Sequence, residues 1–120
     1  GAITNAAANI ARAIGAKALV AFSQTGDTVR RLARLHCELP LLAFTPDPGV
    51  RNQLTLSWGV ETFLVDYVEH TDAMFRQVDH AMLGLGRGVP GELVVVVAGT
   101  PAGTPGSTNT LRIHQLGSLS

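Results

Sequence analysis

The sequence has little cysteine, no excess charge of either sign and no long apolar run. Its single cysteine, Cys37, has no partner for a disulfide within the chain, which fits a reducing, cytoplasmic compartment. Nine basic and nine acidic residues give a formal net charge of zero. This balance argues against a nucleic-acid binder or a polybasic membrane binder, because both need a cationic face. No stretch reaches about 18 consecutive apolar residues, so we expect no membrane span.

What the sequence does contain is material for a folded core. Of its 120 residues, 46% are hydrophobic and 15% are charged, a balance typical of a folded protein. The length predicts a single domain, residues 1–120, and we find no repeat or internal boundary. The alanine-rich start resembles a signal peptide only superficially. Arg12 and Lys17 interrupt its apolar stretch, and no basic region precedes it.

Helix and strand signals alternate along the chain. Apolar spacing predicts helices over residues 4–15, 27–37 and 47–59. It also predicts a longer helix from Thr71 that includes Leu85 and ends at the glycines 84, 86 and 88. Thr4 is the predicted N-cap of the first helix, and Asp47 followed by Pro48 opens the third. Short apolar runs predict strands over residues 18–22, 40–45, 60–65, 93–99 and 110–116.

This order predicts an α/β fold: a three-layer αβα sandwich with a five-stranded, mostly parallel sheet. The first four strands are joined by helices, so we expect them to be parallel with right-handed crossovers. Their apolar runs need cover on both faces of the sheet. The fifth strand follows the fourth without a helix between them, so we expect it to be antiparallel.

Two polar loops follow the first and fourth predicted strands. They are "SQTGDT", residues 23–28, and the Gly- and Pro-rich segment 99–108, which has no charged side chain. In a doubly wound sheet, ligands bind beyond the carboxyl ends of the strands, where the strand order reverses. If the first and fourth strands are neighbours there, the two loops face each other across one crevice.

The chemistry of these loops indicates an oxyanion site. Hydroxyl groups can donate to an anion, glycines let backbone N–H groups approach it, and a helix N-terminus favours negative charge. The candidate site residues are Ser23, Gln24, Thr25, Gly26, Thr28, Gly103, Thr104, Gly106, Ser107 and Thr108. Solvated turns without a ligand are the alternative, and Asp27 would repel a nearby phosphate. We interpret Arg30, Arg31 and Arg112 as solvated surface charges.

Several motifs lack the position or spacing that their chemistry requires. The sequence therefore predicts no catalytic or metal site in this chain. "GRGVPG", residues 86–91, matches a dinucleotide-binding pattern but precedes a strand instead of following one. The loop after the fourth strand lacks the Gly-Lys-Ser/Thr ending of a P-loop. The histidines at positions 36, 70, 80 and 114 have no metal-site spacing. Nothing assembles a nucleophile, a base and an orienting group.

Four stretches carry a family resemblance. They are the alanine-rich start, "AKALVAFSQTGDTVRRLARLHCELPLLAFTPD", "LSWGVETFLV" and "GELVVVVAGTPAGTPGSTNTLRIHQLG". Together they resemble the C-terminal domain of pyruvate kinase over essentially the whole chain, in an actinobacterial form. The last stretch is the most specific, because a Gly-rich loop ending in "GSTNTLRIHQLG" after a valine run marks this family.

The resemblance implies a division of labour. The whole enzyme transfers a phosphoryl group from phosphoenolpyruvate to ADP with Mg²⁺ and K⁺, in a catalytic barrel domain absent from this chain. This domain is then non-catalytic, without a cofactor of its own. It binds a phosphorylated effector between residues 23–28 and 99–108 and contributes to a cytoplasmic homotetramer. The matching residues are Ser23, Thr25, Gly26 and Thr28 in the first loop and 103–108 in the second.

The sequence departs from the family pattern at one point. Eukaryotic sugar-bisphosphate sites use an arginine early in the helix before the fourth strand, where this chain has Met74, with Arg76 two residues later. A monophosphate, such as a hexose 6-phosphate or AMP, therefore fits better than a bisphosphate. An assembly module without an effector site is the alternative function, and an independent small enzyme is a third.

Overall fold

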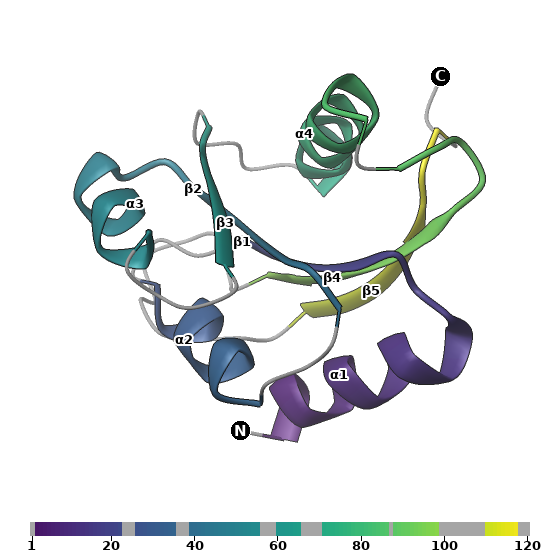
Figure 1. Cartoon of the computed structure of the whole chain (residues 1–120), viewed down its shortest axis with the longest axis horizontal. Helices are drawn as coiled ribbons and strands as arrows, with labels where there is room; N and C mark the ends of the chain where they lie inside the picture. Colours follow the sequence, from purple (N-terminus) through teal and green to yellow (C-terminus); the bar gives the residue numbers. More distant parts are fainter. Residues whose placement is uncertain are drawn as a thin grey trace.

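The computed structural model describes residues 2–22, 26–35, 39–55, 60–65, 71–86, 88–98 and 110–117 (Figure 1). The helices are α1 (Ala2–Ile14), α2 (Asp27–Arg34), α3 (Pro48–Leu54) and α4 (Thr71–Gly84). The strands are β1 (Ala18–Phe22), β2 (Leu41–Thr45), β3 (Val60–Leu64), β4 (Leu93–Ala98) and β5 (Thr110–Gln115). Within these ranges, no helix is long and apolar enough to cross a membrane.

The strands form one five-stranded sheet in the order β3-β2-β1-β4-β5. The pairs β2–β3, β1–β2 and β1–β4 are parallel. β5 pairs with β4 in the antiparallel direction, with Val96 opposite Arg112. The predicted α/β fold, with a mostly parallel sheet and an antiparallel last strand, is confirmed.

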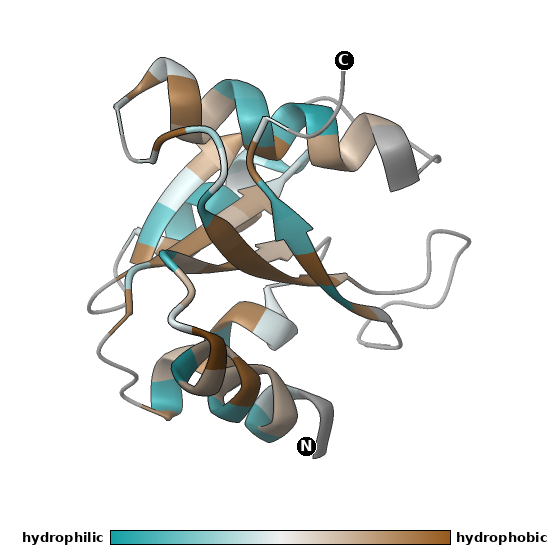
Figure 2. Cartoon of the chain, turned by 90° about the vertical axis from the view of Figure 1, so that its right-hand side faces the viewer, coloured by the Kyte–Doolittle hydropathy of each residue, from teal (hydrophilic) through white to brown (hydrophobic). Residues whose placement is uncertain are grey.

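Helices cover both faces of the sheet, which makes three layers (Figure 1). On one face, buried side chains of α1, α2 and α3 form one core with Val95 and Val97 of β4. On the other face, α4 packs on Val94 and Val96 of the same strand. Figure 2 shows α4 on one side of the sheet and the helices near the N-terminus on the other. Successive side chains of β4 alternate between these two cores, which explains why the strand is a continuous run of valines.

Local hydrogen bonds set helix ends that differ from the predicted ones. Thr4 is not an N-cap, because α1 extends back to Ala2 and buries Thr4 inside the helix, where it is 1% exposed. α2 ends at Arg34, where the Leu35 N–H turns back to the Leu32 carbonyl at 3.1 Å. α3 ends at Leu54 rather than near residue 59.

The two ends of α3 have clear chemical causes. The Asp47 carboxylate accepts hydrogen bonds from the backbone N–H groups of Gly49 at 2.8 Å and Val50 at 3.3 Å. This confirms the predicted start of the helix. At the other end, the Thr55 hydroxyl donates to the Asn52 carbonyl at 2.6 Å and satisfies a group that the next helical turn would have used.

A buried polar contact joins α4 to β5. The His114 imidazole Nε2 lies 2.7 Å from the Asp79 carboxylate, and both side chains are largely buried. The Phe75 ring stacks on the His114 ring, with centroids 4.7 Å apart and an interplanar angle of 8°. The Arg112 guanidinium lies 5.2 Å from the centroid of the Phe75 ring. These contacts fix β5 to α4.

We expect Asp79→Ala to lower the free energy of unfolding by about 1.5–3 kcal/mol, because it leaves the buried His114 imidazole without its charged partner. Urea denaturation followed by circular dichroism measures the loss. The control is His80→Ala, an exposed side chain on the same helix, for which a change within about 0.5 kcal/mol is expected. Equal losses in the two variants would contradict a stabilising His114–Asp79 contact.

Candidate functional site

The strand order reverses between β1 and β4. β2 and β3 lie on one side of β1, whereas β4 and β5 lie on the other. β1 and β4 are parallel neighbours, and Phe22 at the end of β1 is opposite Ala98 at the end of β4. The prediction that the first and fourth strands are neighbours is therefore confirmed. The carboxyl ends of these two strands therefore lie side by side at the same edge of the sheet.

All the predicted site residues belong to the two segments, 23–28 and 99–108, that follow these strands. Ser23, Gln24, Thr25, Gly103, Thr104, Gly106, Ser107 and Thr108 lie outside the described residues. Gly26 and Thr28 lie within them, where β1 has ended and α2 begins. The structure therefore shows where both segments start, and it shows the helix end toward which the first one leads.

Gly26 is the N-cap of α2, in a left-handed conformation with a φ of 88°. A glycine tolerates this conformation without the steric cost that a Cβ would bring. A glycine N-cap also has no side chain to accept hydrogen bonds from the first turn. This contrasts with α3, where Asp47 caps its own helix. Thr28, in the first turn of α2, is buried, with 4% of its surface exposed.

The Arg30 side chain is half-buried and lies next to Gly26 at this end of α2, whereas the sequence predicted a solvated surface charge. A Cβ on Gly26 would lie 3.1–3.2 Å from the Nη1, Cζ and Nη2 atoms of Arg30. The Arg30 Nη2 group donates to the Gln53 side-chain oxygen at 3.0 Å. The spacing Gly26–Arg30 is one helical turn, and this is the signal that could have revealed the contact.

The other predicted surface cations differ from Arg30. Arg31 is exposed, as predicted for a solvated charge. Arg112 is also exposed, but its guanidinium lies against the Phe75 ring of α4. Of the two residues that depart from the family pattern, Met74 packs against the core and Arg76 is exposed.

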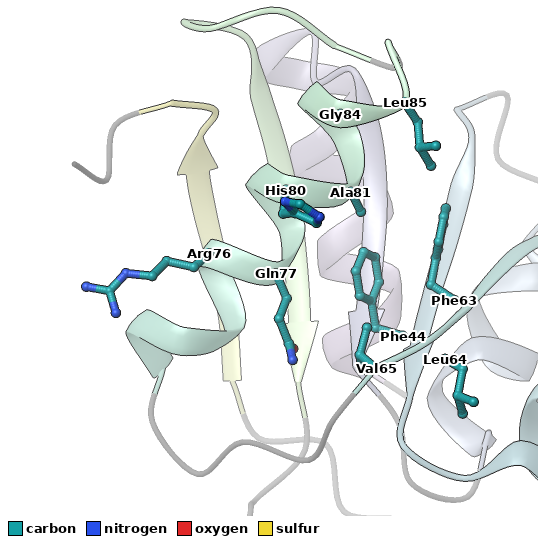
Figure 3. A pocket seen from close by; sticks show the side chains of 10 residues that line it. All are labelled: Phe44, Phe63, Leu64, Val65, Arg76, Gln77, His80, Ala81, Gly84 and Leu85. Carbon is teal, nitrogen blue, oxygen red and sulfur yellow. The ribbon is translucent and has the colours of Figure 1, made fainter.

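A hollow lies between α4 and the strands β2 and β3. It has a volume of about 610 Å³ and a mainly apolar lining that includes Phe44, Phe63 and Leu85. Figure 3 shows the Phe63 and His80 side chains on its two sides and Arg76 extending away from it. This hollow follows from uneven cover: among the described helices, α4 is the one whose side chains pack into this core.

The fold and the paired ends of β1 and β4 define a class of protein. It is a doubly wound α/β domain with its candidate site beyond the carboxyl ends of its parallel strands. A family model described as "Pyruvate kinase, alpha/beta domain" matches residues 1–114. The chain belongs to this pyruvate kinase domain family, and the predicted resemblance is confirmed.

The curated relatives that the chain matches include proteins from actinobacteria. The chain is 58% identical over 117 residues to a pyruvate kinase of Mycobacterium tuberculosis. This match covers 98% of the chain and 25% of the relative. It is 52% identical over 117 residues to a pyruvate kinase of Corynebacterium efficiens, again over 98% of this chain and 25% of the relative. The chain therefore spans about a quarter of the length of these relatives.

Solved structures support the fold. A Cryptosporidium parvum pyruvate kinase in complex with ADP superimposes with a TM-score of 0.85 at 24% identity. The match covers 95% of this chain and 23% of that one.

We expect Gly26→Ala to destabilise the chain more than Gly15→Ala. Both glycines have a positive φ, which costs an alanine about 1–2 kcal/mol. A Cβ on Gly15 meets nothing within 4 Å, whereas one on Gly26 meets the Arg30 guanidinium. The excess loss should be about 0.5–1.5 kcal/mol, the value of a displaced hydrogen bond. Urea denaturation in wild-type and Arg30→Ala backgrounds tests this, because the excess should vanish in the second.

Proposed function

We propose that this chain is the regulatory and oligomerisation domain of a cytoplasmic pyruvate kinase. In the full-length enzyme, a partner catalytic barrel transfers the phosphoryl group from phosphoenolpyruvate to ADP in glycolysis, with Mg²⁺ and K⁺ bound in that barrel. This domain is non-catalytic. Within its described part, no three His, Cys, Asp or Glu side chains are grouped to hold a metal ion.

The effector site of this proposal lies between residues 23–28 and 99–108. The observation that carries it is the parallel pairing of β1 with β4 up to Phe22 and Ala98. Both segments start from neighbouring strand ends at the point where the strand order reverses, which is where ligands bind in this class of fold. The alternative, two solvated turns without a ligand, predicts that no effector binds at this edge.

The chemistry of the two segments favours a phosphate monoester. Hydroxyl groups of Ser23, Thr25 and Thr28 donate from the first segment, and Thr104, Ser107 and Thr108 donate from the second. The glycine N-cap of α2 allows a phosphate oxygen to approach the first-turn N–H groups without a competing side chain. A hexose 6-phosphate or AMP supplies one such group, so these are the effectors to test first.

We expect Thr25→Ala combined with Ser107→Ala to weaken effector binding at least tenfold, because each substitution removes a hydroxyl donor to a charged phosphate. Titration calorimetry of the full-length enzyme with glucose 6-phosphate, AMP and fructose 1,6-bisphosphate measures the affinity. Thr55→Ala, which removes an exposed hydroxyl at the end of α3, is the control. Unchanged affinity in the double variant, or no binding of any compound by the wild type, rules out this site.

A second function, assembly of a homotetramer, is favoured by the position of β5. In the described sheet this strand lies at an edge, and Ile113 on it is 48% exposed. The Leu116 N–H donates to the Glu92 carbonyl of the segment entering β4 at 2.8 Å. Because N–H directions alternate along a strand, the N–H groups of His114 and Arg112 also face β4, whereas that of Ile113 faces outward. An outward row of this kind readily pairs with a second copy.

We expect Ile113→Pro to weaken assembly of the full-length enzyme, because it removes an outward N–H while leaving the ladder to β4 intact. Static light scattering across a dilution series measures the change in mass. Ile113→Thr, which keeps the N–H group and a β-branched side chain, is the control. If the proline variant dissociates no more readily than wild type, the proposed pairing through this edge is wrong. That result does not bear on the proposed effector site.

A further inference from the structure

We propose that the hollow between α4, β2 and β3 is a binding site for a small planar aromatic carboxylate. This hollow includes none of the candidate residues of the effector site, so the two sites stand or fall separately. Three features of the described residues support it. They are a row of aromatic rings that ends in the hollow, a volume suited to a small molecule, and a lining whose charge is basic.

The row of aromatic rings crosses the sheet on the face that α4 covers. Phe22, Phe44 and Phe63 are register partners on β1, β2 and β3. The ring centroids of Phe22 and Phe44 are 5.0 Å apart, and those of Phe44 and Phe63 are 5.1 Å apart. Phe44 is buried, whereas Phe63 is only partly buried. Because β3 lies at an edge of the described sheet, Phe63 is the last ring of the row, and a further planar ring can stack on it.

The volume of the hollow depends on small residues in its helical wall. Ala81 and Gly84 line it from α4, and neither has a side chain long enough to reach β3. Figure 3 shows Ala81 on the α4 side and the rings of Phe44 and Phe63 across from it. The volume of about 610 Å³ lies within the range of about 300–1,000 Å³ that is typical of small-molecule sites. A protein interface takes about 800 Å² from each partner, more than one hollow beside a single helix offers.

The charge of the lining favours an anionic group on the ligand. Arg76 and His80 are one helical turn apart on α4, and both are exposed. Among the described residues that line the hollow, none is acidic. Figure 3 shows the His80 imidazole beside the hollow and the Arg76 guanidinium extending away from it. An imidazole N–H can donate to a carboxylate at the rim, and the nearby Arg76 charge attracts the same group.

Together these features specify how the ligand lies. Its ring stacks on Phe63 in the apolar part of the hollow, and its carboxylate stays at the rim beside His80. An aliphatic acid lacks the flat face that stacks, and a neutral aromatic compound lacks the group that the basic lining attracts. Both are therefore expected to bind more weakly than an aromatic carboxylate of the same size.

The test uses titration calorimetry of the full-length enzyme with 2-naphthoate, 2-naphthalenemethanol and cyclohexanecarboxylate. Excess phosphoenolpyruvate without ADP keeps the catalytic site of the enzyme occupied. 2-Naphthoate should bind about tenfold more tightly than the alcohol, the value of a hydrogen bond to a charged group. It should bind at least about threefold more tightly than cyclohexanecarboxylate, which cannot stack.

Variants of the lining locate the binding site. Ala81→Phe puts a ring into the hollow and should weaken 2-naphthoate binding at least about tenfold, because the probe can no longer bury its own ring. Ala81→Ser leaves the hollow open and is the matched control, with an affinity within about twofold of wild type. Phe63→Leu keeps an apolar side chain but removes the ring face. It should cost 2-naphthoate about threefold to tenfold and leave cyclohexanecarboxylate nearly unchanged.

His80→Ala tests the polar end of the site. The side chain is exposed, so the variant should fold like wild type, and a loss of affinity reports a lost contact with the ligand. We expect 2-naphthoate to bind about tenfold more weakly to this variant, since its carboxylate loses an N–H donor. The preference for 2-naphthoate over the alcohol should shrink by a similar factor.

Four results overturn the proposal. The first is a wild type that binds none of the three probes. The second is unchanged 2-naphthoate affinity in Ala81→Phe, Phe63→Leu and His80→Ala, which places the probe elsewhere on the enzyme. Equal affinity for the alcohol rules out a carboxylate ligand, and equal affinity for cyclohexanecarboxylate rules out an aromatic one. Should Ala81→Phe fail to fold by circular dichroism, wild-type affinity in the other two variants is sufficient to contradict the site.

Discussion

The parallel pairing of β1 with β4 is the constraint on which the rest of this structure depends. It places β1 in the middle of the sheet, so both of its faces must be covered, and its side chains alternate between the two cores. It also reverses the strand order at this point, because β2 and β3 extend the sheet in the other direction. The same backbone hydrogen bonds that build the core therefore bring the strand ends that precede the two polar segments to one edge.

The fold was predictable because its strongest signals are local and regular. Short apolar strands separated by helices predict a parallel sheet whatever the details of packing. The helix ends were less predictable, since they depend on single hydrogen bonds. Periodicity does not reveal that the Thr55 hydroxyl turns back to Asn52, or that α1 buries Thr4 within its first turns. Asp47 is the exception, because an N-cap carboxylate before a proline is readable from sequence.

The candidate site was predictable in its composition and less so in its charge. Hydroxyl groups and glycines after two strands identify the segments, and Gly26 has the conformation that only glycine adopts easily. The place of Arg30 depends on the direction of its side chain and on Gln53, which is 23 positions away in the sequence. A charge count treats Arg30 and Arg31 alike, whereas the helix directs one of them over its own N-terminus and leaves the other exposed.

The contact between β5 and α4 has a mechanical consequence. β5 begins at Thr110, directly after segment 99–109, and runs back along β4. Farther along the same strand, His114 contacts Asp79 of α4, and Phe75 of α4 contacts both the His114 ring and the Arg112 guanidinium. The strand that follows segment 99–109 is therefore held in place by its contacts with α4. In the proposed assembly, this anchored strand is also the sheet edge that pairs with a second copy, which would couple the proposed effector site to the interface between copies.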